Sequence, residues 1–277
     1  MLILSLDGGG TCGVVTLRFL EKLGIRYADD FDLLMGTSSG GIICLGLAKG
    51  FTPDKIREVY YGLGKSVFRV SWWKKLLNPF GLFEPRFEIH ALKDLLKSFF
   101  YTTKIHELEH NVAVVTYDFE REVRKIWRSW AGENREVYEI ATATGAAPWY
   151  FSGYDRYSDG GLVATNPSLL AIREALKLGA DLQSIDLVSI GSGVSVIGTH
   201  DNKHGGALTW APEIASTFMK TQVCAANSIC HELPLKSYKR YDVDLPKGLC
   251  DMVDVSRFTL RAREALVDHL WANFHVA

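Results

Sequence analysis

The chain has 277 residues, with 32 Asp plus Glu against 31 Lys plus Arg and a formal net charge of −1. This balance provides no global positive field to draw the protein onto DNA or RNA, so we expect no nucleic-acid partner. Hydrophobic residues make up 47% and aromatic residues 12% of the chain, which excludes disordered and fibrous classes. The five cysteines are scattered without a CxxC pair, as expected of reduced thiols in the cytoplasm.

The chain opens with Met1-Leu-Ile-Leu-Ser-Leu6 and runs directly into Asp7-Gly-Gly-Gly10. This start lacks the basic segment and the longer apolar run of a secretory signal. The longest nearly uncharged stretch further on, residues 33–48, is shorter than the roughly 20 apolar residues that span a bilayer. We therefore expect a cytoplasmic protein that at most contacts a membrane surface.

Short apolar runs alternate with longer segments of helical period, which predicts βα units and a mainly parallel sheet. The expected strands are Leu2–Leu6, Phe31–Met35, Asn111–Thr116, Val123–Trp127 and Ile185–Ile190. The expected helices are Val14–Leu23, Ser39–Lys49, Pro53–Gly62, Glu88–Phe99, Pro167–Lys177, Pro212–Ser228 and Ser256–Phe274. No internal repeat or linker divides the chain, so we predict a single domain over residues 1–277, with residues 65–86 as an irregular insertion.

The first motif is Gly36-Thr37-Ser38-Ser39-Gly40, between an expected strand and an expected helix. It matches the GxSxG pattern of a nucleophile elbow, a tight turn that presents a serine at the N-terminus of a helix. Gly36 and Gly40 leave room for that turn. Ser38 is therefore the candidate nucleophile.

The second motif is Asp7-Gly8-Gly9-Gly10-Thr11-Cys12-Gly13, also between an expected strand and an expected helix. Consecutive glycines let backbone N–H groups converge on an anion, either a phosphate or the oxyanion of an acyl transfer. The N–H groups of Gly8, Gly9 and Gly10 are the candidate donors. We expect Asp7 to support the turn rather than to take part in chemistry.

The third motif is Ser158-Asp159-Gly160-Gly161. Taken alone, an Asp-Gly turn is common. A serine on an elbow, however, needs a base, and an aspartate on a turn made by Gly160 and Gly161 can approach another loop closely. Asp159 is therefore the candidate base of a two-residue Ser-Asp site.

In this order, the three motifs resemble those of the patatin-like phospholipase family. Residues 7–10 are similar to its oxyanion loop, residues 36–40 to its nucleophile elbow, residues 159–161 to the motif with its catalytic aspartate, and residues 141–151 to a small-residue segment upstream of that aspartate. The resemblance covers about residues 1–195. It implies a three-layer α/β/α sandwich with a mainly parallel central sheet, a Ser38–Asp159 dyad without histidine, and hydrolysis of phospholipid or other acyl-lipid esters through an acyl-enzyme.

One residue departs from the family pattern. The family commonly has arginine two residues after the third glycine of its loop, as DGGGxRG, whereas this chain has Cys12 there. A cysteine cannot replace a bidentate cation. Other residues must shape the loop, or oxyanion stabilisation is weaker, or the substrate differs.

Eight histidines offer an alternative to the dyad, because an α/β-hydrolase triad has the order Ser, acid, His. The histidines that follow Asp159 lie in undistinguished settings, so the dyad is preferred; they include His200, His204, His231 and His269. A second pattern, His106-Glu-Leu-Glu-His110, matches the zinc motif HExxH. An expected strand follows it at once and leaves too little helix, so we predict no metal and no other cofactor.

Within the expected insertion, Trp72 and Trp73 stand beside Lys74 and Lys75. Aromatic rings next to ammonium groups suit the boundary between lipid headgroups and acyl chains. Packing in an irregular part of the core, with the lysines extending outward, explains the pattern equally well. For a lipid hydrolase, this segment is the candidate lid or membrane contact.

Two other functions stay open at this point. Actin-like ATPases and sugar kinases also begin with a strand and an Asp-Gly-Gly-Gly-Thr phosphate loop, but they require a strand after it. A catalytically weak lipid-binding effector is the other alternative, because Cys12 departs from the family pattern. Some bacterial patatin-like proteins are effectors released by a nucleotide signal, which makes a nucleotide activator a candidate partner of this chain.

Overall fold

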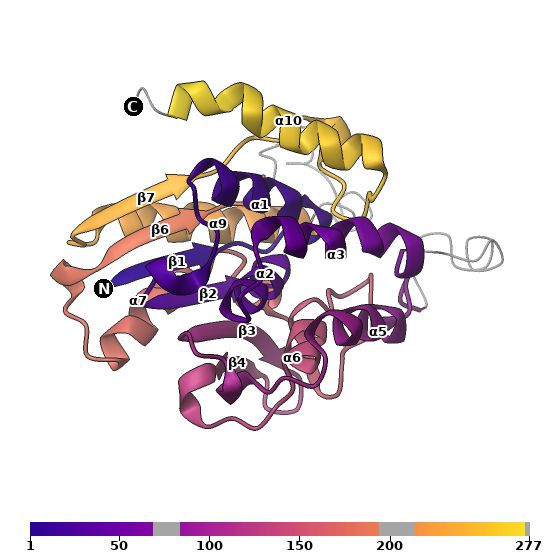
Figure 1. Ribbon diagram of the computed structural model, residues 1–277, viewed down its shortest axis with the longest axis horizontal. Coiled ribbons are helices and arrows are strands. Elements are labelled where there is room, and N and C mark those ends of the chain that lie inside the picture. The colour runs from indigo at the N-terminus through magenta and orange to yellow at the C-terminus, as the bar shows by residue number, and fades with distance from the viewer. Residues whose placement is uncertain (69–83, 194–213, 275–277) are drawn as a thin grey trace.

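Seven strands form one sheet in the computed structural model, in which residues 1–68, 84–193 and 214–274 are described (Figure 1). Five strands are parallel and lie in the spatial order β3 (Val112–Asp118), β2 (Leu33–Thr37), β1 (Leu2–Leu6), β6 (Asp186–Ile190) and β7 (Ser237–Tyr241). The other two pair antiparallel with β3 and are β4 (Val123–Arg128) and β5 (Tyr157–Asp159).

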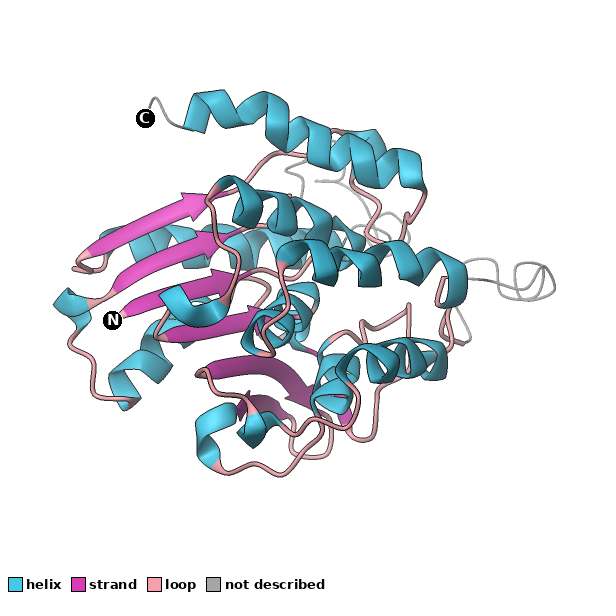
Figure 2. Ribbon diagram, viewed as in Figure 1, coloured by secondary structure: helices cyan, strands magenta, loops and turns pink. Residues whose placement is uncertain are grey.

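Helices cover both faces of this sheet (Figure 2). Successive strand residues point to opposite faces, so Leu4 and Leu34 belong to one buried apolar cluster while Ile3 and Leu33 belong to another. The helices over the first cluster are α1 (Gly13–Lys22), α2 (Ser39–Ala48), α3 (Pro53–Ser66), α5 (Ile89–Phe100), α6 (Val137–Thr144) and α10 (Arg257–Phe274). Those over the second are α7 (Ser168–Lys177) and α9 (Ile214–Glu232). The predicted three-layer α/β/α sandwich with a mainly parallel sheet is confirmed.

The predicted elements are present, with shifts at their ends. The structure begins the second strand at Leu33 rather than Phe31, because the Phe31 N–H donates to the Ala28 carbonyl in a helical turn at 2.9 Å. That strand continues to Thr37, which pairs with Val115 of β3. Three elements, α6, β5 and β7, were not predicted from the sequence, and all three contribute to the site described below.

Two further predictions concern membranes. None of the helices in the described ranges is both long and apolar enough to cross a bilayer. Of the insertion expected over residues 65–86, α3 continues through Ser66, and residues 69–83 lie outside the described part of the chain. The predicted membrane contact at Trp72, Trp73, Lys74 and Lys75 therefore falls on residues that the structure does not describe.

Candidate active site

The sheet register brings two of the predicted motifs together on β3. Thr37, the last residue of β2, lies opposite Val115, and Asp159, the last residue of β5, lies opposite Thr116. Thr37 and Asp159 therefore lie opposite adjacent residues of β3, which brings Ser38, the residue after Thr37, close to Asp159. The Ser38 hydroxyl donates to Asp159 Oδ2 at 2.6 Å.

The elbow is a sharp turn with a strained residue at its tip. Ser38 has φ 52° and ψ −123°, a conformation that non-glycine residues rarely adopt. Gly36 and Gly40 permit it sterically, since a Cβ at Gly36 would lie 2.4 Å from the Gly40 oxygen and a Cβ at Gly40 would lie 2.3 Å from the Leu6 oxygen. The same close approach seats the first turn of α2 against the end of β1.

Asp159 is held on both of its carboxylate oxygens. Oδ2 accepts from Ser38, and Oδ1 accepts from the Gly161 N–H at 2.6 Å. The next residue, Gly160, lies so close to β3 that a Cβ there would be 2.3 Å from the Val115 oxygen. The glycines at 160 and 161 thus allow the close approach of the turn and supply one of its hydrogen bonds.

Burial governs the protonation of this carboxyl. Asp159 is 5% exposed, and burial raises its pKa to about 6, although the hydrogen bonds from Ser38 and Gly161 act in the opposite direction. A carboxyl with this pKa is mostly ionised at neutral pH and can accept a proton there. Among the described residues no histidine makes a hydrogen bond or ion pair to Ser38 or Asp159; His200 and His204 lie outside them.

The glycine loop after β1 lies beside the elbow. A Cβ at Gly8 would be 3.1 Å from Ser38 Cβ, so the two loops are in contact. The Gly8 N–H donates to the Thr165 carbonyl at 3.0 Å. In the described part of the chain, no hydrogen bond uses the N–H of Gly9 or Gly10. This differs from the expectation that all three glycine N–H groups are available, because the chain itself already engages Gly8.

Thr144, at the end of α6, supports the elbow through two hydrogen bonds. It is not among the site residues predicted from the sequence. Its hydroxyl accepts from the Ser38 N–H at 2.9 Å and donates to the Val115 carbonyl at 2.7 Å. The side chain is fully buried. The signal available in the sequence was a threonine in a run of small residues, but its partners depend on the tertiary fold.

Thr144→Val is expected to destabilise the protein by about 2 to 4 kcal/mol, because two buried backbone groups lose their partner. Hydrolysis should fall by about 10 to 100-fold as the elbow relaxes, since small misplacements of reacting groups lower rates strongly. Thr144→Ser keeps the hydroxyl and is the matched control. Urea unfolding and ester hydrolysis measure the two effects, and a valine variant that behaves like the serine variant would contradict this role.

Cys12, which replaces the arginine common in the family, lies next to a buried arginine from α10. Cys12 is 1% exposed, and burial raises the pKa of its thiol to about 12, with the charge of Arg263 acting against that rise. Arg263 is fully buried and donates to Thr11 Oγ1 at 3.0 Å. It also donates to the carbonyls of Leu249 and Asp251. A cation supplied from elsewhere in the chain therefore stands beside this turn.

A helix, α1, follows the glycine loop. The actin-like alternative requires a strand at this position, so the structure does not favour it. The HExxH residues also lack a shared helix: residues 105–107 form a single helical turn, His106 Nδ1 lies 3.1 Å from the Glu133 oxygen, and His110 contacts Asp29.

Comparison with known proteins finds relatives that are named as phospholipases. The family model described as "Patatin-like phospholipase" matches residues 4–172. A "cGAMP-activated phospholipase" of Pseudomonas aeruginosa is 31% identical over 219 residues, which are 74% of this chain and 65% of that protein. The human "Calcium-independent phospholipase A2-gamma" is 30% identical over 219 residues, 69% of this chain and 28% of that protein. VipD from Legionella pneumophila, a solved structure, has 14% identity and a TM-score of 0.44 over 97% of this chain and 66% of VipD.

The protein therefore has an α/β/α sandwich in which the serine of an elbow lies within hydrogen-bond distance of an aspartate. The matched model covers more than half of the chain, and the chain belongs to the patatin-like phospholipase family. It spans about two thirds or less of the length of the curated relatives reported above.

Proposed function

We propose that this chain is a serine acyl hydrolase that cleaves carboxylic esters of phospholipids or other acyl lipids. The contact of 2.6 Å between Ser38 Oγ and Asp159 Oδ2, on a strained elbow, carries this proposal. Ser38 attacks the ester carbonyl while Asp159 takes its proton, and Asp159 then gives that proton to the alcohol oxygen as the C–O bond breaks, which leaves an acyl-enzyme. In the second half, Asp159 takes a proton from the water that attacks the acyl carbonyl and passes it to Ser38 Oγ as the bond to the acyl group breaks, which releases the fatty acid and restores Ser38.

The oxyanion in this mechanism is stabilised by the N–H groups of Gly9 and Gly10. Both are without a partner in the described part of the chain, and the loop contacts the elbow at Gly8. Preorganised backbone donors of this kind stabilise the charge that develops in the transition state. Membership of the patatin-like family supports the assignment of the loop.

Covalent capture tests the nucleophile. A fluorescent alkyl phosphonate should label the purified chain at Ser38, and Ser38→Ala should lose both the label and hydrolysis of mixed phospholipid vesicles. Ser39→Ala is the matched control, because Ser39 is the neighbouring buried serine and its hydroxyl has no partner among the described residues. Ester hydrolysis that survives in Ser38→Ala would contradict the proposal. Vesicle binding without hydrolysis by the unaltered chain would instead support the lipid-binding alternative.

The same assay shows which ester of the lipid is cleaved and whether a nucleotide activates the enzyme. Analysis of the released fatty acids and lysolipids distinguishes attack at the sn-1 ester, at the sn-2 ester or on lysophospholipid. Because the Pseudomonas relative is named as cGAMP-activated, we propose that a nucleotide can raise the activity of this chain. Hydrolysis is therefore measured with and without cGAMP.

Hydrolysis of a soluble ester is expected to rise with pH and to be half-maximal near the pKa of Asp159, about 6. The base must be ionised to accept the Ser38 proton, so activity is absent well below that pKa and constant well above it. The pH dependence of kcat/KM measures this, with thermal melting at each pH to show that the protein stays folded. A profile that is flat between about pH 5 and pH 7 would contradict a buried carboxylate base.

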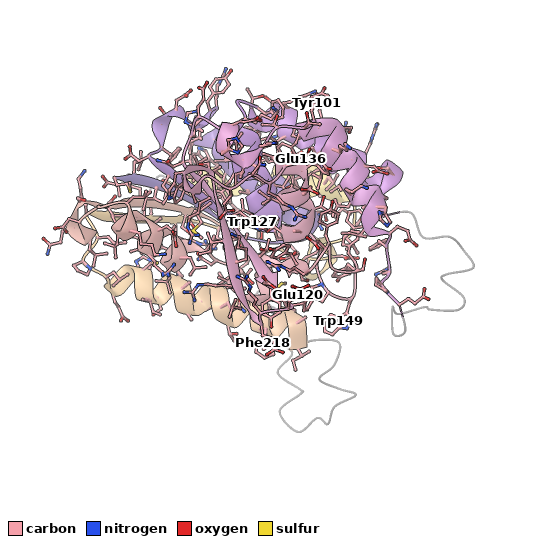
Figure 3. All side chains as sticks on the ribbon, turned by 90° about the horizontal axis from the view of Figure 1, so that it is seen from below. Tyr101, Glu120, Trp127, Glu136, Trp149 and Phe218 are labelled. Atoms are coloured by element: carbon pink, nitrogen blue, oxygen red, sulfur yellow. The ribbon has the colours of Figure 1, made fainter. Side chains whose placement is uncertain are left out.

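We propose a membrane contact on exposed aromatic residues near the site. Trp149 is 55% exposed and lies three residues after Ala146, whose carbonyl accepts from the Asp159 N–H at 3.1 Å. Phe218, on α9, is 60% exposed. In the view of Figure 3 both side chains project outward along the same lower edge, whereas Tyr101 lies at the opposite edge. Exposed aromatic rings of this kind insert at the boundary of headgroups and acyl chains.

Replacement of both Trp149 and Phe218 by alanine is expected to lower the vesicle-bound fraction by about tenfold or more, because about 1.5 to 3 kcal/mol accompanies full burial of a large apolar side chain. Hydrolysis of a soluble ester should be unchanged. Tyr101→Ala, which removes another exposed aromatic ring, is the control. Vesicle sedimentation decides the matter, and equal binding by the control and the double variant places the contact elsewhere.

A further inference from the structure

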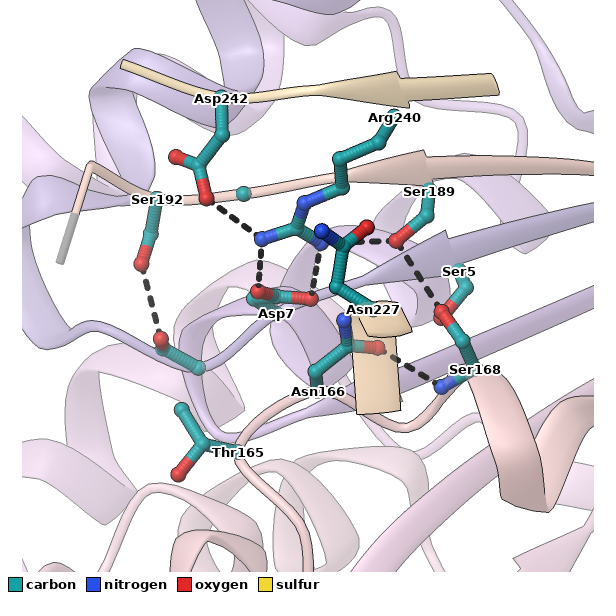
Figure 4. Close-up of polar contacts among 12 residues, drawn as sticks. Ser5, Asp7, Thr165, Asn166, Ser168, Ser189, Ser192, Asn227, Arg240 and Asp242 are labelled. Atoms are coloured by element: carbon teal, nitrogen blue, oxygen red, sulfur yellow. Dashed lines mark hydrogen bonds and ion pairs between the residues drawn. The ribbon is translucent and has the colours of Figure 1, made fainter. Parts of the chain in front are cut away.

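A buried ion pair lies at the start of the glycine loop (Figure 4). Arg240, on β7, donates to both oxygens of Asp7, at 3.0 Å from Nη1 and at 2.6 Å from Nη2. The same guanidinium donates to Ser189 Oγ at 2.7 Å and to Asp242 Oδ2 at 2.5 Å. The side chain of Arg240 is 10% exposed and that of Asp7 is 1% exposed. The pair is thus buried, bidentate and held on several sides.

Asp7 is the residue from which the glycine loop departs. Its N–H donates to the Ile190 carbonyl at 3.1 Å, and the Gly8 N–H donates to the Thr165 carbonyl at 3.0 Å. The Ser192 hydroxyl donates to the Gly8 carbonyl at 2.8 Å. Because the C=O and N–H of a trans peptide point in opposite directions, this bond turns the Gly9 N–H away from Ser192. The Asp7–Gly8 peptide and the Gly8–Gly9 peptide are therefore each held by a hydrogen bond.

Apart from Thr165, the residues described above that hold this end of the loop come from the later part of the chain. Ile190, Ser192 and Arg240 all follow the segment that matches the family model, residues 4–172. Arg240 differs from the other two because it acts on a side chain and carries a charge. A guanidinium that binds a carboxylate through two parallel N–H groups fixes its plane as well as its position. The orientation of Asp7, and of the peptide that it precedes, is therefore coupled to β7.

Net stabilisation is a weak explanation for such a pair. Desolvation of two buried charges offsets much of their attraction, so well-packed apolar residues often stabilise a fold equally well. Burial raises the pKa of Asp7 to about 6 even though the charge of Arg240 lowers it. Without Arg240 that pKa would rise further, and a protonated carboxyl would lose the fixed orientation that the ion pair imposes.

We propose that Arg240 is a positioning residue: through Asp7 it holds the loop so that the N–H groups of Gly9 and Gly10 face the oxyanion. This inference rests on the proposed acyl hydrolase function. It also assigns to the C-terminal strand, which lies outside the matched segment, a part in the arrangement of the reacting site.

The test compares Arg240→Lys and Arg240→Met with Lys239→Met, which changes an exposed neighbour on the same strand. With a soluble ester, both Arg240 variants should lower kcat by about 10² or more and leave KM nearly unchanged, because loss of one oxyanion donor lowers kcat by about 10² to 10³-fold. Phosphonate labelling of Ser38 should slow in parallel. In the folded protein, hydrogen exchange at residues 8–11 should accelerate by about tenfold or more.

A second comparison separates positioning from general damage. The double variant with Asp7→Asn and Arg240→Met should hydrolyse the ester no more slowly than Arg240→Met alone, because the two changes remove the same interaction. If Arg240→Met does not fold, Arg240→Lys and Ser189→Ala carry the comparison, since each removes only part of the contacts.

The inference is overturned if folded Arg240 variants match Lys239→Met in kcat and in exchange of the loop, or if only KM changes. Failure of the proposed function looks different: the unaltered chain would then neither hydrolyse esters nor react with the phosphonate. In that case, unchanged exchange at residues 8–11 in the Arg240 variants would still overturn the inference, and faster exchange would support the part of it that concerns the loop.

Discussion

Asp159→Asn is expected to abolish ester hydrolysis and, at neutral pH, to make the folded protein more stable. An amide cannot take the Ser38 proton, and loss of a general base lowers rates by about 10² to 10⁴-fold. The amide oxygen can still accept from the Gly161 N–H, which donates to Asp159 Oδ1 at 2.6 Å. The fold around the turn should therefore be retained.

The gain in stability follows from the pKa of Asp159, which burial raises from 3.8 to about 6 in the folded state. Between these values the folded protein binds more protons than the unfolded chain, so the wild-type protein loses stability as pH rises from about 4 to about 6. The loss above that window is of the order of 3 kcal/mol, given about 1.4 kcal/mol for each pKa unit. An asparagine does not ionise and avoids it.

Urea unfolding of both proteins between about pH 4 and pH 8 measures this difference. The advantage of Asp159→Asn should be small at the acid end, grow through about pH 5 and reach a plateau above about pH 6. Asp7 also has a pKa raised to about 6, but it titrates in both proteins and cancels in the comparison. A difference that does not vary with pH would show that Asp159 does not titrate as a buried carboxyl.

The features that sequence alone could predict are those that depend on local sterics. Gly36 and Gly40 are required because backbone atoms approach within 2.4 Å of the positions that their Cβ atoms would take. These glycines lie within two residues of Ser38 in the sequence, so the requirement can be recognised from the sequence alone. The alternation of apolar runs and helical segments likewise predicts the order of strands and helices, because burial on a sheet face has its own period.

The features that sequence could not predict depend on partners far apart in the chain. Arg240 and Asp7 are separated by 233 positions. Ser237–Tyr241 is a polar stretch, so β7 showed no apolar alternation to identify it, and β5 has only three residues. Arg263 occupies a helix rich in charged residues, where a buried arginine has the same sequence appearance as an exposed one. Only the packed fold shows which of these side chains are withdrawn from water.

Cys12→Arg, which restores the residue common in the family, is expected to destabilise this protein by about 3 to 5 kcal/mol, the range found when a charge is left buried without a partner. Cys12 is 1% exposed, so a much larger side chain has no space there. Arg263 already places a buried cation beside it, and its donors are engaged by Thr11 and by backbone carbonyls. A second guanidinium would meet both repulsion and overpacking.

Urea unfolding measures the effect, with Cys12→Ala as the control for loss of the thiol. Because the repulsion comes from Arg263, the double variant Cys12→Arg with Arg263→Met should be more stable than Cys12→Arg alone. A Cys12→Arg protein as stable as Cys12→Ala would mean that position 12 has room for an arginine and that Arg263 does not occupy its place. Recovery in the double variant would instead show that this chain supplies from its last helix a cation that the family commonly carries in the loop itself.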